Sequence, residues 1–169
     1  MKKVGIFYAS DTGNTEAIAE KMLAAFGEDN AQIFDVSDAD ASDMEPFTNL
    51  IFSSPTWGSG DLQDDFDEFM EEISKTDFDG KTIALFGLGD GVTYEDTFVD
   101  AMGQIYEVLE EKGCKIVGSV STEGYEFDSS LSEKEDGRFV GLALDEDNQD
   151  DLTDERITNW VAQLKGEFE

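Results

Sequence analysis

The sequence contains no histidine, a single cysteine and few cationic side chains. Because histidine is absent, the usual general base and the commonest metal ligand of proteins are missing, which excludes an acyl-transfer triad of the Ser-His type. The single cysteine, Cys114, excludes an internal disulfide bond. Nothing near Cys114 in the sequence would lower the pKa of its thiol, so we expect a small buried apolar residue rather than a redox group.

Lysine and arginine together number 11, against 41 aspartate and glutamate residues, and the formal net charge is −30 at pH 7. This charge repels nucleic-acid phosphates and anionic lipids, so we expect neither nucleic acid nor a membrane as a partner. A macromolecular partner should instead present a basic face. Hydrophobic residues make up 39% of the chain and recur with regular spacing, which indicates a packed core rather than disorder.

Long hydrophobic runs are also absent. Only six residues of strand-like character precede Ser10, too few for a signal peptide or a membrane span, so we expect a cytoplasmic protein. A chain of 169 residues can bury roughly 70% of its unfolded surface around one core. We therefore expect a single domain over residues 1–169, and a monomer.

Short apolar runs alternate with amphipathic segments along the whole chain. The expected strands are Val4–Ala9, Ala31–Val36, Asn49–Ser53, Lys81–Leu88 and Lys115–Val120, the last resuming at Phe139–Ala143. This alternation is typical of βαβ units with a parallel sheet. We predict an α/β fold: a doubly wound five-stranded parallel sheet of order 2-1-3-4-5 with helices on both faces. A long polar loop, Ser121 to Gly137, interrupts its last strand.

Four helices are expected from apolar residues at helical spacing, and the acidic stretch from Ser37 to Pro46 is expected to be a weak helix or a loop. The first covers Thr15 to Phe26, and a second, capped by Asp61, carries the stripe that contains Phe66 and Ile73. The third begins near Phe98 and ends at Gly113. Thr153 is expected to cap the last helix.

An acidic run near the C-terminus has part of the pattern of a calcium loop. Asp145, Asp147 and Gln149 have the required spacing, but Asp150 replaces the glycine that such a loop needs after them. We interpret this run as a solvated acidic turn and expect no metal site.

The run between the first strand and the first helix has the composition of a phosphate-binding loop. Free backbone N–H groups and the positive end of the helix dipole favour an anion there. The residues that would contribute are Ser10, Asp11, Thr12, Gly13, Asn14 and Thr15. No lysine follows the glycine and no G-x-G-x-x-G is present, so neither common nucleotide loop fits. An ordinary turn with Asn14 or Thr15 as the helix N-cap explains this hexapeptide equally well.

The predicted strand order decides between these two interpretations. It makes strands 1, 3 and 4 neighbours, so the loops that carry Ser10 to Thr15, Trp57 and Tyr94 should meet at one edge of the sheet. A loop Trp or Tyr by itself is more often packing than a ligand platform. Two of them beside an anion loop favour a planar aromatic ligand that bears a phosphate.

At these motifs the chain resembles a long-chain flavodoxin over essentially its whole length. The motifs are Ser10 to Thr15, Pro55 to Gly58, Gly87 to Tyr94 and Phe139 to Gln149, and the insertion from Ser121 to Gly137 is what separates long from short members. The resemblance implies one non-covalent FMN, with its phosphate on Ser10 to Thr15 and its isoalloxazine ring between Trp57 and Tyr94. The remaining expected cofactor-binding residues are Pro55, Thr56, Gly58, Gly60, Gly89, Asp90 and Asp147.

The resemblance also implies a low-potential one-electron carrier that uses the semiquinone/hydroquinone couple of FMN and is not itself an enzyme. Its partners would be basic redox proteins, an NADPH-dependent flavodoxin reductase and iron-sulfur acceptors. The net charge of −30 predicts that such basic partners are steered to the protein, with docking charges near Trp57 at Asp64, Asp65, Asp67 and Glu68. One alternative is a flavin-dependent quinone reductase-like enzyme, although no segment is evident for a nicotinamide cofactor. Another is a receiver domain, which needs an Asp at the end of the third strand, where Ser53-Ser54-Pro55 stands.

Overall fold

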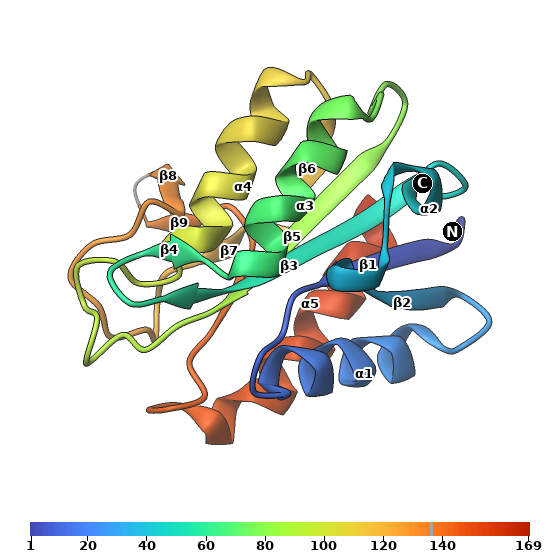
Figure 1. Cartoon of the computed structure of the whole chain (residues 1–169). Helices are drawn as coiled ribbons and strands as arrows, with labels where there is room; N and C mark the ends of the chain where they lie inside the picture. Colours follow the sequence, from blue (N-terminus) through green and yellow to red (C-terminus); the bar gives the residue numbers. More distant parts are fainter. Residues whose placement is uncertain (136) are drawn as a thin grey trace.

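The computed structural model describes residues 1–135 and 137–169, and its centre is a parallel sheet between two layers of helices (Figure 1). The sheet strands are β1 (Val4–Tyr8), β2 (Ala31–Asp35), β3 (Asn49–Trp57), β5 (Thr82–Leu88), β6 (Lys115–Val117) and β10 (Leu142–Leu144). They pair in the order β2-β1-β3-β5, and both β6 and β10 pair with β5. Both the predicted strand order and the interrupted last strand are therefore confirmed.

Helices cover both faces of this sheet, as predicted. They are α1 (Asn14–Phe26), α2 (Ala41–Met44), α3 (Asp64–Lys75), α4 (Asp100–Glu111) and α5 (Thr153–Glu167), with short 3-10 turns η1 (Val36–Asp38) and η2 (Asp150–Leu152). Figure 1 shows α3 and α4 on one face and α1 and α5 on the other. No helix in the described part of the chain is long and apolar enough to span a membrane.

The sheet separates two hydrophobic clusters because successive side chains of a strand point to opposite faces. Phe7 and Phe52 belong to the cluster under α3 and α4, whereas Ile6 and Ile51 belong to the cluster under α1 and α5. All four side chains are fully buried. Burial on both faces explains why β1 and β3 read as continuous apolar runs rather than as alternating ones.

The insertion after β6 is more ordered than the polar loop that the sequence predicts. A small antiparallel sheet holds its two ends, formed by β7 (Val120–Ser121), β8 (Glu133–Glu135) and β9 (Arg138–Phe139). Aromatic side chains anchor its middle to the main domain: Phe127 lies 5.5 Å from Phe98 and 5.2 Å from Phe139, between ring centroids. This cluster is not visible in a sequence pattern because its members come from distant segments.

Two predicted helix caps are wrong. Asp61 belongs to β4 (Asp61–Leu62), which turns back antiparallel on β3, so Gln63 caps α3 instead and accepts a hydrogen bond from Phe66 N at 3.1 Å. Thr153 is the first residue of α5, not its cap, because the 3-10 turn η2 leads directly into the helix. A cap residue needs an extended backbone, and here the chain is already helical.

Two predicted element boundaries are also wrong. Strand β3 continues to Trp57 because Ser54 and Pro55 pair with the end of β5, where the sequence predicts a loop from Ser54 onward. Helix α4 begins at Asp100 rather than near Phe98. Both boundaries follow from contacts with other elements.

Two glycines provide a matched test of the packing between β5 and β10. A Cβ on Gly141 would lie 2.1 Å from the carbonyl oxygen of Leu85, whereas one on Gly166, in α5, would meet nothing within 4 Å. Gly141→Ala should therefore lower the free energy of unfolding by about 1–3 kcal/mol, as overpacking does. Gly166→Ala should leave it unchanged or raise it by about 0.5–1 kcal/mol, since alanine favours helix. Urea unfolding of both variants checks this, and equal stabilities would contradict the close approach.

Candidate functional site

The loops after β1, β3 and β5 meet at the carboxyl edge of the sheet and enclose a cleft of about 320 Å³. A fourth segment, after β10, closes one side. The residues that line the cleft are Asp11, Thr12, Asn14, Thr15, Pro55, Thr56, Trp57, Leu88, Gly89, Asp90, Tyr94, Glu146 and Asp147. Most of the residues that the sequence singles out are therefore together, although Ser10, Gly13, Gly58 and Gly60 lie outside the lining.

The loop after β1 exposes the start of α1. Gly13 occupies the N-cap position in a left-handed conformation, φ 86°, and no side chain caps the helix, so the N-cap interpretation of Asn14 or Thr15 is wrong. The Ser10 hydroxyl instead accepts a hydrogen bond from Gly13 N at 3.1 Å and tightens the loop. The first-turn N–H groups of α1 therefore point out of the helix without a side-chain acceptor, as an anion site requires.

Two large aromatic side chains flank the cleft and remain unusually exposed. Trp57, at the end of β3, is 49% exposed, and Tyr94, in the loop after β5, is 43% exposed. Large side chains of this kind are normally well covered in a folded chain. Their position on a cleft indicates surfaces that a flat ligand can cover.

The turn that carries Trp57 depends on two glycines. Gly60 N donates to Trp57 O at 3.1 Å, and both Gly58 and Gly60 have positive φ, 48° and 105°. These angles are costly for residues with a Cβ. The two glycines therefore shape the turn between β3 and β4, and Gly60 faces the start of α4 rather than the cleft.

Hydrogen bonds between acidic residues and neighbouring amides join the loops after β5 and β10. Asp145, which the sequence suggests is solvated, is only 2% exposed and accepts from Gly91 N at 3.0 Å and from Asn148 N at 3.0 Å. Asn148 Nδ2 also donates to Asp90 Oδ1 at 2.8 Å. The interpretation of a solvated turn is wrong for Asp145, and sequence reasoning missed the roles of Asp145 and Asn148.

The same network sets the protonation behaviour of two carboxylates at the cleft. Burial by itself would raise the pKa of Asp90, but hydrogen bonds from Thr93, Asn148 and Val92 hold it below its usual range. The pKa of Asp147 is raised, first by burial and then by the neighbouring carboxylates Asp90, Asp145 and Glu146. The wall of the cleft at Asp147 therefore bears crowded negative charge.

Known proteins resemble this chain in both sequence and structure. The family model of flavodoxin matches residues 6–160. The chain belongs to the flavodoxin family. It is 48% identical to a Nostoc flavodoxin over 99% of this chain and 98% of that protein, and 50% identical to the Helicobacter pylori flavodoxin over 99% of each. The crystal structure of Fusobacterium nucleatum flavodoxin bound to flavin mononucleotide superposes with a TM-score of 0.93, at 36% identity and 100% coverage of both chains.

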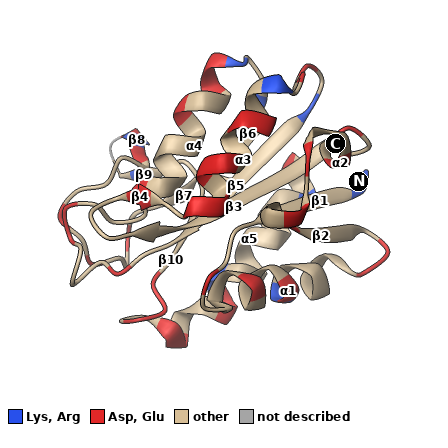
Figure 2. Ribbon diagram, in the orientation of Figure 1, with Lys and Arg blue, Asp and Glu red and all other residues tan. Residues whose placement is uncertain are grey.

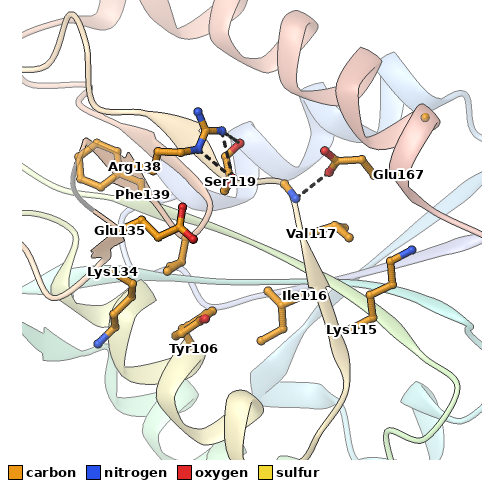
Figure 3. Close-up of a pocket in the computed structure, with 13 residues that line it drawn as sticks. Tyr106, Lys115, Ile116, Val117, Ser119, Lys134, Glu135, Arg138, Phe139 and Glu167 are labelled. Atoms are coloured by element: carbon orange, nitrogen blue, oxygen red, sulfur yellow. Dashed lines mark hydrogen bonds between the residues drawn. The ribbon is translucent and has the colours of Figure 1, made fainter.

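This flavodoxin has a second and larger cavity, of about 550 Å³, between β6, the C-terminal end of α5 and the insertion (Figure 3). Three of the few cations of the chain line it, and each lies near a protein acceptor. Arg138 donates to Ser119 at 2.9 Å, Lys134 pairs with Glu107 at 2.8 Å, and Lys115 lies 3.8 Å from a Glu169 carboxylate oxygen.

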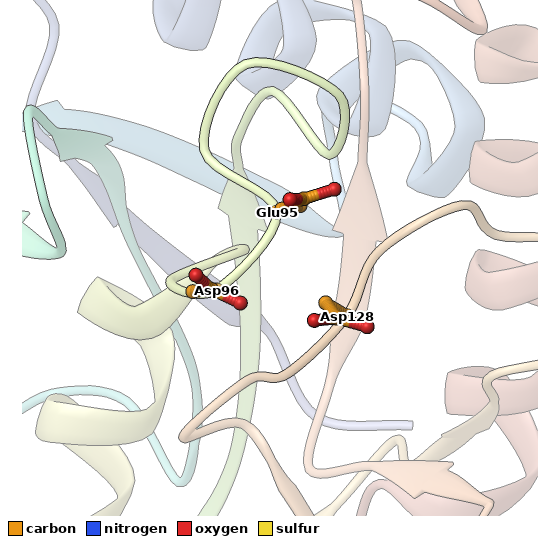
Figure 4. A group of neighbouring side chains, drawn as sticks. All are labelled: Glu95, Asp96 and Asp128. Carbon is orange, nitrogen blue, oxygen red and sulfur yellow. The ribbon is translucent and has the colours of Figure 1, made fainter.

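Three carboxylates gather where the insertion meets the loop after β5 (Figure 4). Glu95, Asp96 and Asp128 are all exposed, and oxygen atoms of the three lie within 4.8 Å of one another. Exposed carboxylates alone do not define a metal site. The backbone beneath them is more informative, because Asp128 N and Ser129 N both donate to Glu95 O, at 2.8 and 2.9 Å. The insertion is thus hydrogen-bonded to the loop that carries Tyr94.

Proposed function

We propose that this flavodoxin binds one FMN in the cleft between the loops after β1, β3 and β5, and passes single electrons from a reductase to acceptor proteins. One observation carries the proposal: the uncapped start of α1 and the exposed pair Trp57 and Tyr94 line the same cleft. FMN supplies the electron chemistry when bound, while the protein provides binding, orientation and electrostatics. The chain is an electron-transfer protein rather than an enzyme, and its membership of the flavodoxin family replaces the receiver-domain alternative.

The phosphate lies at the start of α1. Backbone N–H groups of the Ser10 to Thr15 loop and the hydroxyls of Thr12 and Thr15 bind it there, while the Ser10 hydroxyl tightens the loop by accepting from Gly13 N. No lysine or arginine is among the described residues that line the cleft. Asp11 would repel a phosphate, but its carboxylate already accepts a hydrogen bond from Gln63 Nε2 at 2.8 Å, which holds it to the start of α3. The donor set therefore fits a dianion without a paired cation.

The flavin ring lies between Trp57 and Tyr94. Polar groups at its edge come from Thr56, Gly89, Asp90 and Asp147, and Pro55 supports the strand end beneath it. The Thr56 hydroxyl accepts from Ala101 N at 3.2 Å and keeps its own O–H, which it can donate to a ligand. Gly58 and Gly60 act indirectly, by shaping the turn that presents Trp57.

The electron partners are basic proteins, an NADPH-dependent reductase and iron-sulfur acceptors, that dock beside the exposed aromatic edge. Acidic residues are spread over α1, α3 and the loops, as Figure 2 shows. A groove of about 510 Å³ between η1 and α3 is lined by Asp65, Asp67, Glu68, Glu71 and Glu72. Gln63 links this groove to the cleft, since it donates to Asp65 Oδ2 at 3.0 Å as well as to Asp11.

The high net charge also bears on the oligomeric state of the protein. Copies that each carry a formal charge of −30 repel one another, which favours a monomer, and the same charge disfavours binding to nucleic acid or anionic lipid. We propose that the protein acts as a monomer in the cytoplasm. Sedimentation of the purified protein at moderate salt measures its oligomeric state.

The aromatic sandwich can be tested by truncation. Because stacking of a base on an aromatic side chain is worth ~1–3 kcal/mol, Trp57→Ala and Tyr94→Ala should each weaken FMN binding at least about fivefold. Titration of the apoprotein, followed by quenching of flavin fluorescence, measures the affinity. Val92→Ala is the matched control, because Val92 is a 54% exposed apolar residue of the same loop that does not line the cleft. Parental affinity in both alanine variants would contradict the sandwich.

The phosphate site can be tested with riboflavin, which has the same ring but no phosphate. Since hydrogen bonds to a charged group contribute about 1.5–3 kcal/mol each, riboflavin should bind at least about a hundredfold more weakly than FMN. Thr12→Val should narrow that difference, whereas Ser59→Ala, a hydroxyl outside the cleft lining, should not. Equal affinities for the two flavins would place the phosphate away from α1.

Docking can be tested through ionic strength. With a basic partner, the second-order rate of electron transfer should fall several-fold or more from low to high salt, because screening weakens steering. Neutralising Asp64, Asp65, Asp67 and Glu68 to their amides should flatten that dependence. The control variant neutralises Glu28, Asp29, Glu110 and Glu111, exposed residues beyond the opposite edge of the sheet. Stopped-flow rates measure this dependence. If the two variants lost the same share of the salt dependence, docking at α3 would be contradicted.

A further inference from the structure

The chain enters α4 through an unusual backbone conformation. Val99 has φ 48° and ψ 31°, and it is the one non-glycine residue with positive φ in residues 1–135 and 137–169. Its side chain is completely buried, and a β-branched residue is a rare occupant of this region. Asp100 follows, a carboxylate that is only 6% exposed and whose pKa is raised by that burial. Such a conformation persists only where surrounding contacts hold it.

On one side, the insertion holds this segment. Ser132, itself fully buried, donates from its hydroxyl to Val99 O at 2.6 Å, and Leu131 N donates to Asp100 Oδ1 at 2.8 Å. A Cβ on Gly103, one turn into the helix, would lie 2.6 Å from the carbonyl carbon of Leu131. The insertion therefore rests directly on the first turn of α4.

On the other side, the same helical turn holds the segment that presents Trp57. Ala101 N donates to Thr56 Oγ1 at 3.2 Å, and Gln104 Nε2 donates to Gly60 O. A Cβ on Gly60 would lie 3.0 Å from Asp100 Oδ2, so the carboxylate fills the space beside this glycine. Asp100 thus contacts the insertion with one oxygen and the Trp57 turn with the other.

We propose that Asp100 is a positioning residue for the flavin ring, which joins the insertion to the Thr56–Gly60 turn and so fixes Trp57 in its stacking position. This inference rests on the proposed binding of FMN. A buried carboxylate costs desolvation free energy, and an apolar side chain would fill the same space without that cost. Its hydrogen bond to the insertion is what an apolar residue cannot replace.

The contact pattern predicts an effect on one half of the cleft alone. Asp100 and its partners hold the turn after β3. Other hydrogen bonds hold the Ser10 to Thr15 loop: Gly13 N donates to the Ser10 hydroxyl, and Gln63 Nε2 donates to Asp11. Loss of the Asp100 contact should therefore weaken binding of the ring and leave binding of the phosphate unchanged. A general loosening of the domain would weaken both.

The experiment measures the affinities of the apoprotein for FMN, riboflavin and inorganic phosphate. In Asp100→Ala, the affinities for FMN and riboflavin should both fall roughly tenfold, the cost of one hydrogen bond to a charged group, while phosphate binding stays at the parental value. Asp100→Asn keeps the Oδ1 acceptor and should restore flavin binding. Glu107→Ala is the matched control, because Glu107 is another α4 carboxylate that bonds the insertion, through Lys134 at 2.8 Å, but has no hydrogen bond to the Thr56–Gly60 turn among the described residues.

Gln104→Leu provides a second approach that does not disturb a buried charge. It frees the Gly60 carbonyl and should give the same pattern as Asp100→Ala, even if the latter folds poorly. Parental riboflavin affinity in both variants, or an equal loss of phosphate binding, would overturn the inference. Failure of the parent protein to bind FMN would instead overturn the proposed function.

Discussion

The parallel pairing of β1, β3 and β5 is the constraint on which the rest of this structure depends. Because all three strands run the same way, their carboxyl ends lie at one edge of the sheet, and the loop that follows each strand begins there. The helix start after β1, the Trp57 turn after β3 and the Tyr94 loop after β5 are brought together in this way. The three loops lie far apart in the sequence, but the order and the common direction of the strands bring them together.

The second constraint is electrostatic, because a very acidic protein has to hold a dianion. A carboxylate about 10 Å from the phosphate in a water-like dielectric opposes it by only about 0.4 kcal/mol per unit charge, and salt reduces this further. Backbone N–H groups in direct contact contribute more than that each. Local donors can therefore outweigh the distant acidic surface, particularly where Gln63 restrains the nearest carboxylate, Asp11. The acidic surface can therefore attract basic protein partners at longer range without preventing phosphate binding.

The insertion is integrated with the cleft rather than appended to the edge of the sheet. Its aromatic residues pack on Phe98, its backbone bonds Glu95 O, and its Ser132 hydroxyl bonds Val99 O. All of these contacts fall on the segment between Tyr94 and α4. A conformation as restricted as that of Val99 needs such support, so the insertion and the flavin loops form one mechanical unit.

Local patterns in the sequence determined the element types and the loops that carry the cleft, because apolar periodicity and turn residues act over a few positions. The strand order followed from the handedness of βαβ crossovers, which leaves few arrangements for five parallel strands. The caps at Asp61 and Thr153 were wrong because β4 and η2, which displace them, depend on distant pairing and on the path of the preceding turn. Asp145 looked solvated in a run of acidic residues, but in the folded chain it is buried and accepts from Gly91 N, a residue 54 positions away in the sequence. The contact of Asp100 with both Leu131 and Gly60 likewise exists only in three dimensions, since packing alone joins three segments that no local pattern connects.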